Sequence, residues 1–380
     1  MLELEGKYTS AKIFADTIEN GVIEQVKSVL DHPIFKDCQI RIMPDCHSGK
    51  GCVIGFTSPL PKNGEIIPNI IGVDIHCGML AIKLSDKDIV DFSKLDKVIN
   101  RNIPVGRDGR KIASKRIPEE FIEEIKYWSK DWLKDNFLTH MQKIGSLGDG
   151  NHFISIEKGS TGTYLIIHTG SRNIGNKLAI EFQKLAIEKH CYGEGRLKEL
   201  SYLDGKDAEN YIKCMHFCEE YARLNRDIIA HDIMVGMRWK EIDRIETIHN
   251  YINKNDNIIR KGAITCNKNE LAIIPINMAY GTFIVRGKGN LEWNNSGPHG
   301  AGRILSRTQA ENTLTMQEYT ESMKNIYSSC ISTNTLDEAP MAYKNGDEIK
   351  KLITPTADIA DHLIPIYNFK ANVNYKKNRK

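Results

Sequence analysis

Short apolar segments alternate with polar, glycine-containing turns along most of the chain. Runs rich in isoleucine, leucine and valine that are bounded by turn residues are typical of strands. We expect strands at residues 39–43, 52–56, 79–83, 163–168, 271–276 and 282–285. Loops between buried strands commonly carry functional side chains, so the polar turns are the places to search for chemistry.

Longer segments with apolar residues three and four positions apart predict helices. One is expected at residues 85–100 with Ser85 as its cap, and another begins at Pro118, a residue tolerated in the first turn. Further helices are expected at residues 176–190, 207–234 and 302–328, the last opening at Gly302 and Arg303. Mixed strands and helices, without an internal repeat or a long linker, predict one α/β-type domain around a single cleft.

Composition narrows the class of protein. Of 380 residues, 41% are hydrophobic and 27% charged, which is ordinary for a soluble globular enzyme. The 52 Lys and Arg nearly balance the 49 Asp and Glu. This balance excludes a surface that is basic overall, as a protein that coats polyanions would have, and leaves room for a local basic cleft.

The sequence features that bear on cellular location point to the cytoplasm. No segment approaches the ~18 consecutive apolar residues of a membrane span, and the first residues lack the pattern of a signal peptide. Nine cysteines, an odd number scattered over a long chain, argue against a disulfide framework. We therefore expect a cytoplasmic protein with no membrane partner, whose cysteines are buried thiols or metal ligands.

The turn at residues 71–79 concentrates candidate metal ligands. Asp74, His76 and Cys77 lie within four residues, between glycines and after an apolar run. A carboxylate with a thiolate suits a divalent transition metal, because the thiolate is too soft a ligand for magnesium. The alternative is an aspartate that caps a turn beside a buried cysteine.

Three later histidines stand in short polar signatures. His152 follows Asn151, His168 ends a predicted strand, and His249 precedes an asparagine. With Asp74 and Cys77 they make five potential ligands, and two adjacent metals sharing Cys77 would be consistent with them. Spacing alone does not show that they converge, and a single histidine at a strand end is more often a hydrogen-bonded core residue.

A different chemistry is indicated at residues 296–303. His299 stands among glycines before the predicted helix 302–328, where backbone and helix N-terminus favour a phosphate. Arg303 can add charge-assisted hydrogen bonds, and a histidine at this place can act as a nucleophile on phosphorus. The alternative is a glycine-rich connection with a structural histidine.

Two smaller polar groups complete the set. Asp45, His47 and Lys50 form a cluster in a glycine turn that does not match the P-loop pattern. Cys214 and Cys218 share one face of a predicted helix, without a second pair at zinc-finger spacing, and are interpreted as packed thiols.

Together these clusters resemble the RtcB family of GTP-dependent RNA ligases. The resemblance covers about residues 40–370, and its motifs stand in family order. They are MPDCHSGKG at 43–51, GVDIHCGM at 72–79, GSLGDGNHF at 145–153, HTGSR at 168–172, HN at 249–250, RKGA at 260–263 and HGAGR at 299–303, followed by Lys370. Each motif alone is weak, but the ordered set is highly specific.

The resemblance implies an α+β fold with mixed sheets around a central metal-containing cleft. It implies a catalytic domain at residues 1–370 and a basic tail at 371–380. It also implies two manganese ions with a bridging Cys77, and His299 as the residue that becomes guanylylated. The implied metal ligands are Asp74, Cys77, His152, His168 and His249. The implied nucleotide and RNA contacts are Asn151, Arg172, His299, Gly300, Ala301, Gly302, Arg303 and Lys370, with Asp45 beside the active centre.

The implied reaction joins an RNA 3′-phosphate, or a 2′,3′-cyclic phosphate, to a 5′-hydroxyl, in RNA repair or tRNA splicing. The partners are therefore GTP and RNA ends. The sequence leaves open the biological RNA, the oligomeric state and the need for an activating protein partner.

Several positions depart from the family pattern. His76 and Ser155 stand where the family usually has glycine and an acid, and Pro298 replaces a cysteine. Residues 277–282 replace a compact glycine-containing loop, and the chain is shorter than many members. These changes suggest a divergent branch, with repair of a particular cleaved RNA as one hypothesis.

Two other functions compete with ligation. One is a metal-dependent RNA-end phosphoesterase without nucleotidyl transfer, favoured by Ser155 and Pro298. The other is an RNA-end-binding module without turnover. The complete set of potential metal ligands together with His299 argues against this second alternative.

Overall fold

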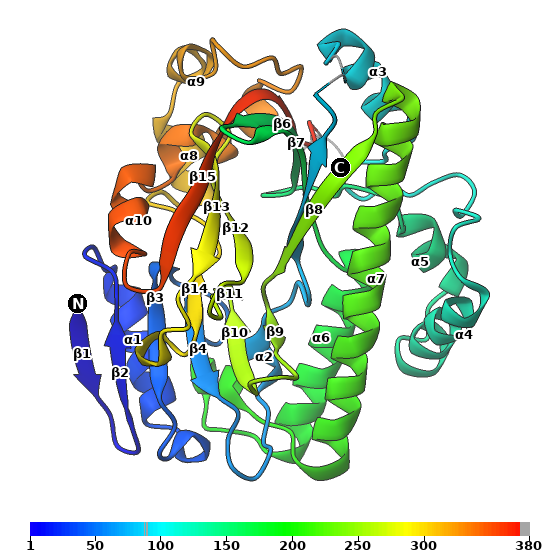
Figure 1. Cartoon of the computed structure of the whole chain (residues 1–380). Coiled ribbons are helices and arrows are strands. Elements are labelled where there is room, and N and C mark those ends of the chain that lie inside the picture. The colour runs from blue at the N-terminus through cyan, green and yellow to red at the C-terminus, as the bar shows by residue number, and fades with distance from the viewer. Residues whose placement is uncertain (87, 89, 373–380) are drawn as a thin grey trace.

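The computed structural model describes residues 1–86, 88 and 90–372. Most of the predicted tail 371–380 therefore lies outside the described residues. The mixed α+β fold class is confirmed, with a strongly curled sheet at its centre (Figure 1).

Two larger sheets form the framework. The first has the order β1 (Leu2–Glu5), β2 (Ser10–Ile13), β3 (Ile40–His47), β4 (Ile54–Pro59), β10 (Ile258–Lys261) and β9 (Tyr251–Ile252). The second has the order β12 (Leu271–Asn277), β13 (Gly281–Gly287), β15 (Ala357–Phe369), β6 (Phe153–Gly159), β7 (Gly162–Thr169), β5 (Gly78–Leu84) and β8 (Glu241–Ile248). Strands β2 and β3 are parallel, whereas every pair in the second sheet is antiparallel. A short ladder of β11 (Ala263–Thr265) and β14 (Ser296–Pro298) lies between them.

The second sheet curls until its two edge strands meet. The Ile273 amide in β12 donates to the Thr247 hydroxyl in β8 at 2.9 Å. Figure 1 shows the curl running from yellow β12 and β13 through red β15 to β5 and β8. The sheet therefore has a concave face that is enclosed by protein and a convex face that is covered by helices.

Alternation along the strands divides their side chains between these faces. Leu80, Ile82 and Leu165 pack outward in one core with Ile229 and Ile233 of the long helix α7 (Gly205–Met237). Met79, Ala81, Ile166, Ile273 and Leu363 pack on the concave side. Both faces are apolar because both are buried. The sequences of these strands are therefore nearly continuous hydrophobic runs.

The remaining helices surround this framework. They are α1 (Asn20–Leu30), α2 (Pro68–Ile71), α3 (Phe92–Asn102), α4 (Glu119–Tyr127), α5 (Phe137–Lys143), α6 (Arg172–Lys189), α8 (Arg307–Thr313), α9 (Met316–Ser322) and α10 (Gly346–Leu352). Helices α6 and α7 pack against each other, and α7 also packs on β7 of the curled sheet (Figure 1). No helix in the described part of the chain is both long and apolar enough to cross a membrane.

Two predicted helices differ from the structure. The predicted helix 302–328 is wrong, because α8 and α9 are separate short helices. Each begins at its own capping box, Ser306 with Gln309 and Thr315 with Glu318. The predicted helix 85–100 begins only at Phe92, where Asp91 accepts from the Lys94 amide, so Ser85 is not its cap. Of the predicted apolar positions in this segment, Ile89 lies outside the described residues.

Candidate functional site

Four neighbouring strands place the predicted ligands at one end of the curled sheet. Cys77 directly precedes β5 and His152 directly precedes β6, whereas His168 lies at the end of β7 and His249 directly follows β8. The antiparallel register pairs Met79 with His168, and His168 with Phe153. Residues far apart in the sequence therefore meet because alternate strands start and end at the same edge.

The turn before β5 is held by hydrogen bonds to the turn that follows β8. The Asn250 side chain donates to the Asp74 carbonyl at 2.9 Å, and the His249 amide donates to the Cys77 carbonyl at 2.9 Å. Gly72 has φ of 106°, a conformation that suits glycine. The segment is thus a rigid platform rather than a free loop.

The five predicted ligands form two groups that share one thiol. One group is Cys77, His168 and His249, and the other is Asp74, Cys77 and His152, each with its ligand atoms within 4.8 Å of one another. Cys77 Sγ lies 3.4 Å from His152 Nε2 and 3.3 Å from His168 Nε2. The convergence that spacing could not show is present in the structure.

Backbone carbonyls orient two of the imidazoles. His152 Nδ1 lies 3.0 Å from the Leu147 carbonyl, and His168 Nδ1 lies 3.2 Å from the Asn151 carbonyl. A carbonyl can only accept, so each Nδ1 carries a proton. The Nε2 of His168 then presents its lone pair to the shared centre, whereas the Nε2 of His152 lies 3.2 Å from Asp74 Oδ2, another potential ligand atom of its own group.

Burial sets the charge state of the group. It lowers the pKa of His168 and His249 well below the usual value, so both imidazoles are neutral. Burial, followed by the charge of Asp74, raises the pKa of the Cys77 thiol well above its usual value. A divalent cation would reverse this last effect, since a coordinating thiol is deprotonated by the ion it binds.

His299 lies beside this group, directly after β14. Its ring is 4.8 Å from the His249 ring, centroid to centroid. Its Nδ1 donates to Asp45 Oδ2 at 2.7 Å, and its backbone amide lies 3.2 Å from the same oxygen. Asp45 is fully buried at the end of β3, so it holds the ring and leaves Nε2 as the free nitrogen. The predicted polar turn at Asp45 is therefore strand.

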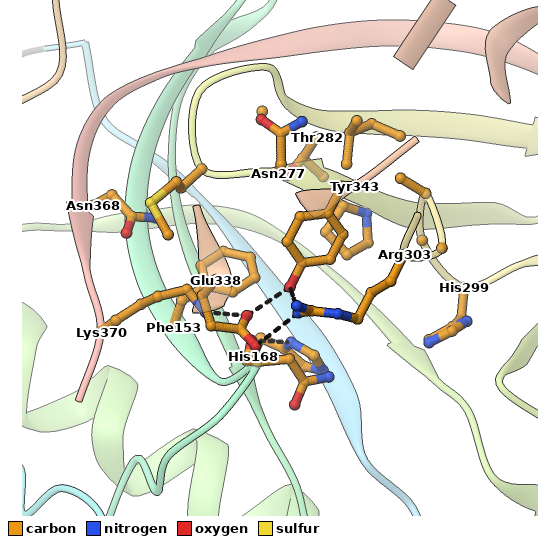
Figure 2. Close-up of a pocket in the computed structure, with 18 of the residues that line it drawn as sticks. Phe153, His168, Asn277, Thr282, His299, Arg303, Glu338, Tyr343, Asn368 and Lys370 are labelled. Atoms are coloured by element: carbon orange, nitrogen blue, oxygen red, sulfur yellow. Dashed lines mark hydrogen bonds and ion pairs between the residues drawn. The ribbon is translucent and has the colours of Figure 1, made fainter. Parts of the chain in front are cut away.

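A cavity of about 310 Å³ opens from His299 into the concave side of the curled sheet. In Figure 2, His299 lies at one end and Asn368 and Lys370 lie at the other, with Arg303 and Tyr343 between them. Gly300, Ala301 and Gly302, which the family resemblance implies as nucleotide contacts, also line it. The altered loop contributes Asn277, whose side-chain oxygen accepts from two backbone amides of its own turn.

Glu338 is the charged centre of this cavity, and no sequence pattern indicated it. Its carboxylate contacts Arg303, Arg307 and Lys370 at 2.6–3.2 Å, and it accepts from the Tyr343 hydroxyl at 2.6 Å (Figure 2). Burial opposes the charge, but the cations around it lower the pKa of Glu338 to about 2. Arg303 therefore belongs to a buried ion cluster, not to the start of a long helix as predicted.

Replacing Glu338 with glutamine should destabilise the fold by about 3 kcal/mol at pH 7, because three cations lose their shared counter-ion. Since its folded-state pKa is lowered from 4.5 to about 2, the carboxylate stabilises fully above pH 4.5 and loses this effect as pH falls toward 2. Urea unfolding should show that the difference in unfolding free energy between wild type and variant at pH 3 is less than half of that at pH 7. An equal difference in unfolding free energy at pH 7 and pH 3 would contradict the role of Glu338 as the shared counter-ion. The control is Glu188→Gln, because Glu188 is exposed.

A second cavity, of about 580 Å³, opens on the other side of the ligand groups. Asp74, His152, Arg172 and Lys143 line it. Asn151 lines both cavities, so the shared thiol group lies where the two meet. Arg172 is fixed by donating to the Gly106 carbonyl at 3.0 Å, and it is one of the basic groups at this opening.

His76 takes no part in either ligand group and lines neither cavity. It is buried beside Tyr251, with ring centroids 5.7 Å apart, and burial lowers its pKa to about 3. It has φ of 56°, which turns its side chain away from its two neighbouring ligands. His76, a candidate ligand from its position between Asp74 and Cys77, is therefore absent from both groups of ligand atoms found among the described residues.

Comparison with known proteins shows the family of this chain. The family model described as tRNA-splicing ligase RtcB matches residues 25–371. The chain is 32% identical over 354 residues to the RNA-splicing ligase RtcB of Escherichia coli, covering 83% of this chain and 85% of that protein. It is 26% identical to the tRNA-splicing ligase RtcB of Nanoarchaeum equitans and 24% identical to that of Methanococcus maripaludis, with at least 90% of each chain covered. The chain therefore belongs to the RtcB family.

Proposed function

We propose that this protein is a GTP- and manganese-dependent RNA ligase that joins a 3′-phosphate or 2′,3′-cyclic phosphate end to a 5′-hydroxyl end. One observation carries the proposal: two ligand groups share Cys77, and His299, oriented by a buried Asp45, lies directly beside them. A pair of metal ligand groups next to an oriented nucleophile is suited to phosphoryl or nucleotidyl transfer.

The donor set fits manganese. Three imidazoles, one carboxylate and one thiol offer nitrogen, oxygen and sulfur ligands, and a thiolate disfavours magnesium. His168 and His249 with Cys77 would hold one ion, and Asp74 and His152 with Cys77 the other. The bound ions would neutralise phosphate charge and help to orient in-line attack.

In the proposed reaction, His299 acts as the nucleophile of the first step. Its Nε2 lone pair forms a bond to the α-phosphorus of GTP, the bond from that phosphorus to the bridging oxygen breaks, and pyrophosphate leaves. Asp45 holds Nδ1–H throughout and stabilises the positive charge that the ring gains. Guanylyl-histidine is the product of this step.

The second cavity is suited to the RNA ends. Arg172 and Lys143 would bind phosphates there, and Asn151 would contact both substrates. An oxygen of the RNA 3′-phosphate displaces His299 from the guanylyl phosphorus. The 5′-hydroxyl oxygen then attacks the RNA phosphorus and loses its proton, and GMP leaves. A cyclic end is first opened by water to a 3′-phosphate.

A ligation assay tests the proposal. RNA with a 2′,3′-cyclic phosphate end and a 5′-hydroxyl end should be joined with GTP and manganese, and not when GTP is left out. Cyclic-phosphate opening without joining in the presence of GTP would instead support the phosphoesterase, the second candidate function. Binding of RNA ends without any turnover would support a non-catalytic module.

Changing Asp45 to asparagine should slow guanylylation by about 100-fold or more, because an amide can donate to Nδ1 and favour the wrong tautomer. Metal content should be unchanged, since Asp45 belongs to neither ligand group. Asp361→Asn serves as control, because this aspartate also accepts from backbone amides but lines neither cavity. A rate within threefold of wild type in Asp45→Asn would remove the orienting role.

A further inference from the structure

Asn225 is a fully buried polar residue inside the long helix α7. Asparagine is disfavoured in the interior of a helix, and a buried amide is costly unless its polar groups are hydrogen-bonded. Asn225 lines neither cavity and belongs to neither ligand group. The proposed reaction therefore gives it no direct role, and its contacts need another explanation.

The side-chain amide of Asn225 is bonded to two turns beside the ligands. Its Oδ1 accepts from the backbone amides of Gly145 at 2.7 Å and Ser146 at 3.0 Å. Its Nδ2 lies 3.2 Å from the Ser146 carbonyl and the Thr169 hydroxyl, and 3.3 Å from the Gly170 carbonyl. Because backbone amides can only donate, these partners fix the orientation of the side chain and use its full hydrogen-bonding capacity.

These hydrogen bonds end on the carbonyl that orients His152. The Thr169 hydroxyl donates to the Leu147 carbonyl at 2.7 Å, and His152 Nδ1 donates to the same carbonyl at 3.0 Å. Asn225 holds the two residues before Leu147 and also donates to the Thr169 hydroxyl oxygen. A continuous chain of hydrogen bonds therefore runs from Asn225 to the imidazole of His152.

This chain of hydrogen bonds reaches one ligand group and not the other. His152 belongs to one group only, and it lies in the turn before β6, outside the strand. His168, in the other group, lies within β7 between β5 and β6, and its Nδ1 contacts the Asn151 carbonyl instead. The sheet thus fixes His168, whereas His152 depends on support from α7.

We propose that Asn225 is a positioning residue that sets, through the Thr169 hydroxyl, the orientation of His152 and the metal affinity of its ligand group. This inference rests on the proposed function for the presence of a metal, but its test needs neither GTP nor RNA. Loss of the groups that orient a metal ligand typically lowers metal affinity by about 10–100-fold.

Binding of Mn²⁺ alone by Asn225→Asp tests the inference. Aspartate keeps the shape of the side chain and its acceptor, but it replaces the donor by an oxygen that faces the Ser146 and Gly170 carbonyls. Calorimetric titration should show two Mn²⁺ sites in wild type. In the variant one site should weaken about tenfold or more, and the other should stay within about threefold of wild type. Added to His152→Ala, the change should have no further effect on Mn²⁺ affinity, because the ligand that it orients is already absent.

The matched control is Asn294→Asp. Asn294 is also buried, and its Nδ2 also donates to a threonine hydroxyl, that of Thr57 at 3.1 Å, and to a carbonyl, that of Gln39 at 3.0 Å. It belongs to neither ligand group, so both Mn²⁺ affinities should be kept. Thr169→Val is the second variant: it removes the hydroxyl with little change of shape and should weaken the same site several-fold. This variant decides the question if Asn225→Asp does not fold.

The outcomes separate this inference from the proposed function. If Asn225→Asp and Thr169→Val bind Mn²⁺ at both sites within about threefold of the Asn294→Asp control, the positioning role is wrong. Equal weakening of both sites in the two variants would also overturn it, because the effect would not be specific to His152. In either case the ligase is judged separately, by the guanylyl adduct of wild type. If wild type binds no Mn²⁺, both proposals fail.

Discussion

Replacing Cys77 with alanine should remove both metal ions together. The Cys77 thiol belongs to both ligand groups, and each group keeps only two ligands without it. We expect metal affinity to fall at least about 100-fold for both sites, and guanylylation to be lost with it. Metal content after gel filtration, measured by atomic emission, checks this directly.

The control for this variant is Cys214→Ala. Cys214 is also a fully buried thiol, but it lies on α7 outside both ligand groups. It should retain the wild-type metal content and ligation rate. A Cys77→Ala protein that keeps one full equivalent of metal and still forms an adduct would contradict the bridging role.

Replacing His299 with alanine should abolish guanylylation and lower ligation by a factor of about 10³ or more, because no other group can form the covalent intermediate. Metal binding should survive, since His299 is not a member of either ligand group. His231→Ala is a suitable control, as His231 lines neither cavity.

This variant also separates the steps of the proposed mechanism. If Nε2 of His299 is needed only for nucleotide transfer, opening of a 2′,3′-cyclic end should continue in His299→Ala at a rate close to that of wild type. Loss of cyclic-phosphate opening together with metal would instead show that the substitution had disturbed the ligand groups.

The strands and their functional turns could be predicted from local pattern. The runs after Cys77 and before His168 are apolar because both faces of the curled sheet are buried, and the ligands stand where those runs begin or end. Their convergence could not be predicted from spacing. It depends on the register of β6, β7, β5 and β8, which is a property of the whole sheet.

Two other features, the Glu338 cluster and the position of His76, became evident only from the tertiary structure, whereas the break between α8 and α9 had a local sequence signal. Glu338 stands in an unremarkable polar segment, and only its burial among cations shows its importance. The break between α8 and α9 had a readable signal, because Ser306 and Thr315 each precede a capping partner by three residues. His76 was grouped with Asp74 and Cys77 by sequence, yet its left-handed backbone separates it from them.

The most direct test of the account is mass spectrometry of the intact protein after incubation with GTP and manganese, followed by peptide mapping. The account predicts the added mass of one guanylyl group on the peptide that contains His299, in a bond labile to acid, and no such addition in His299→Ala. A fully metal-loaded protein that binds GTP yet carries no adduct, or carries it at another residue, would contradict the account.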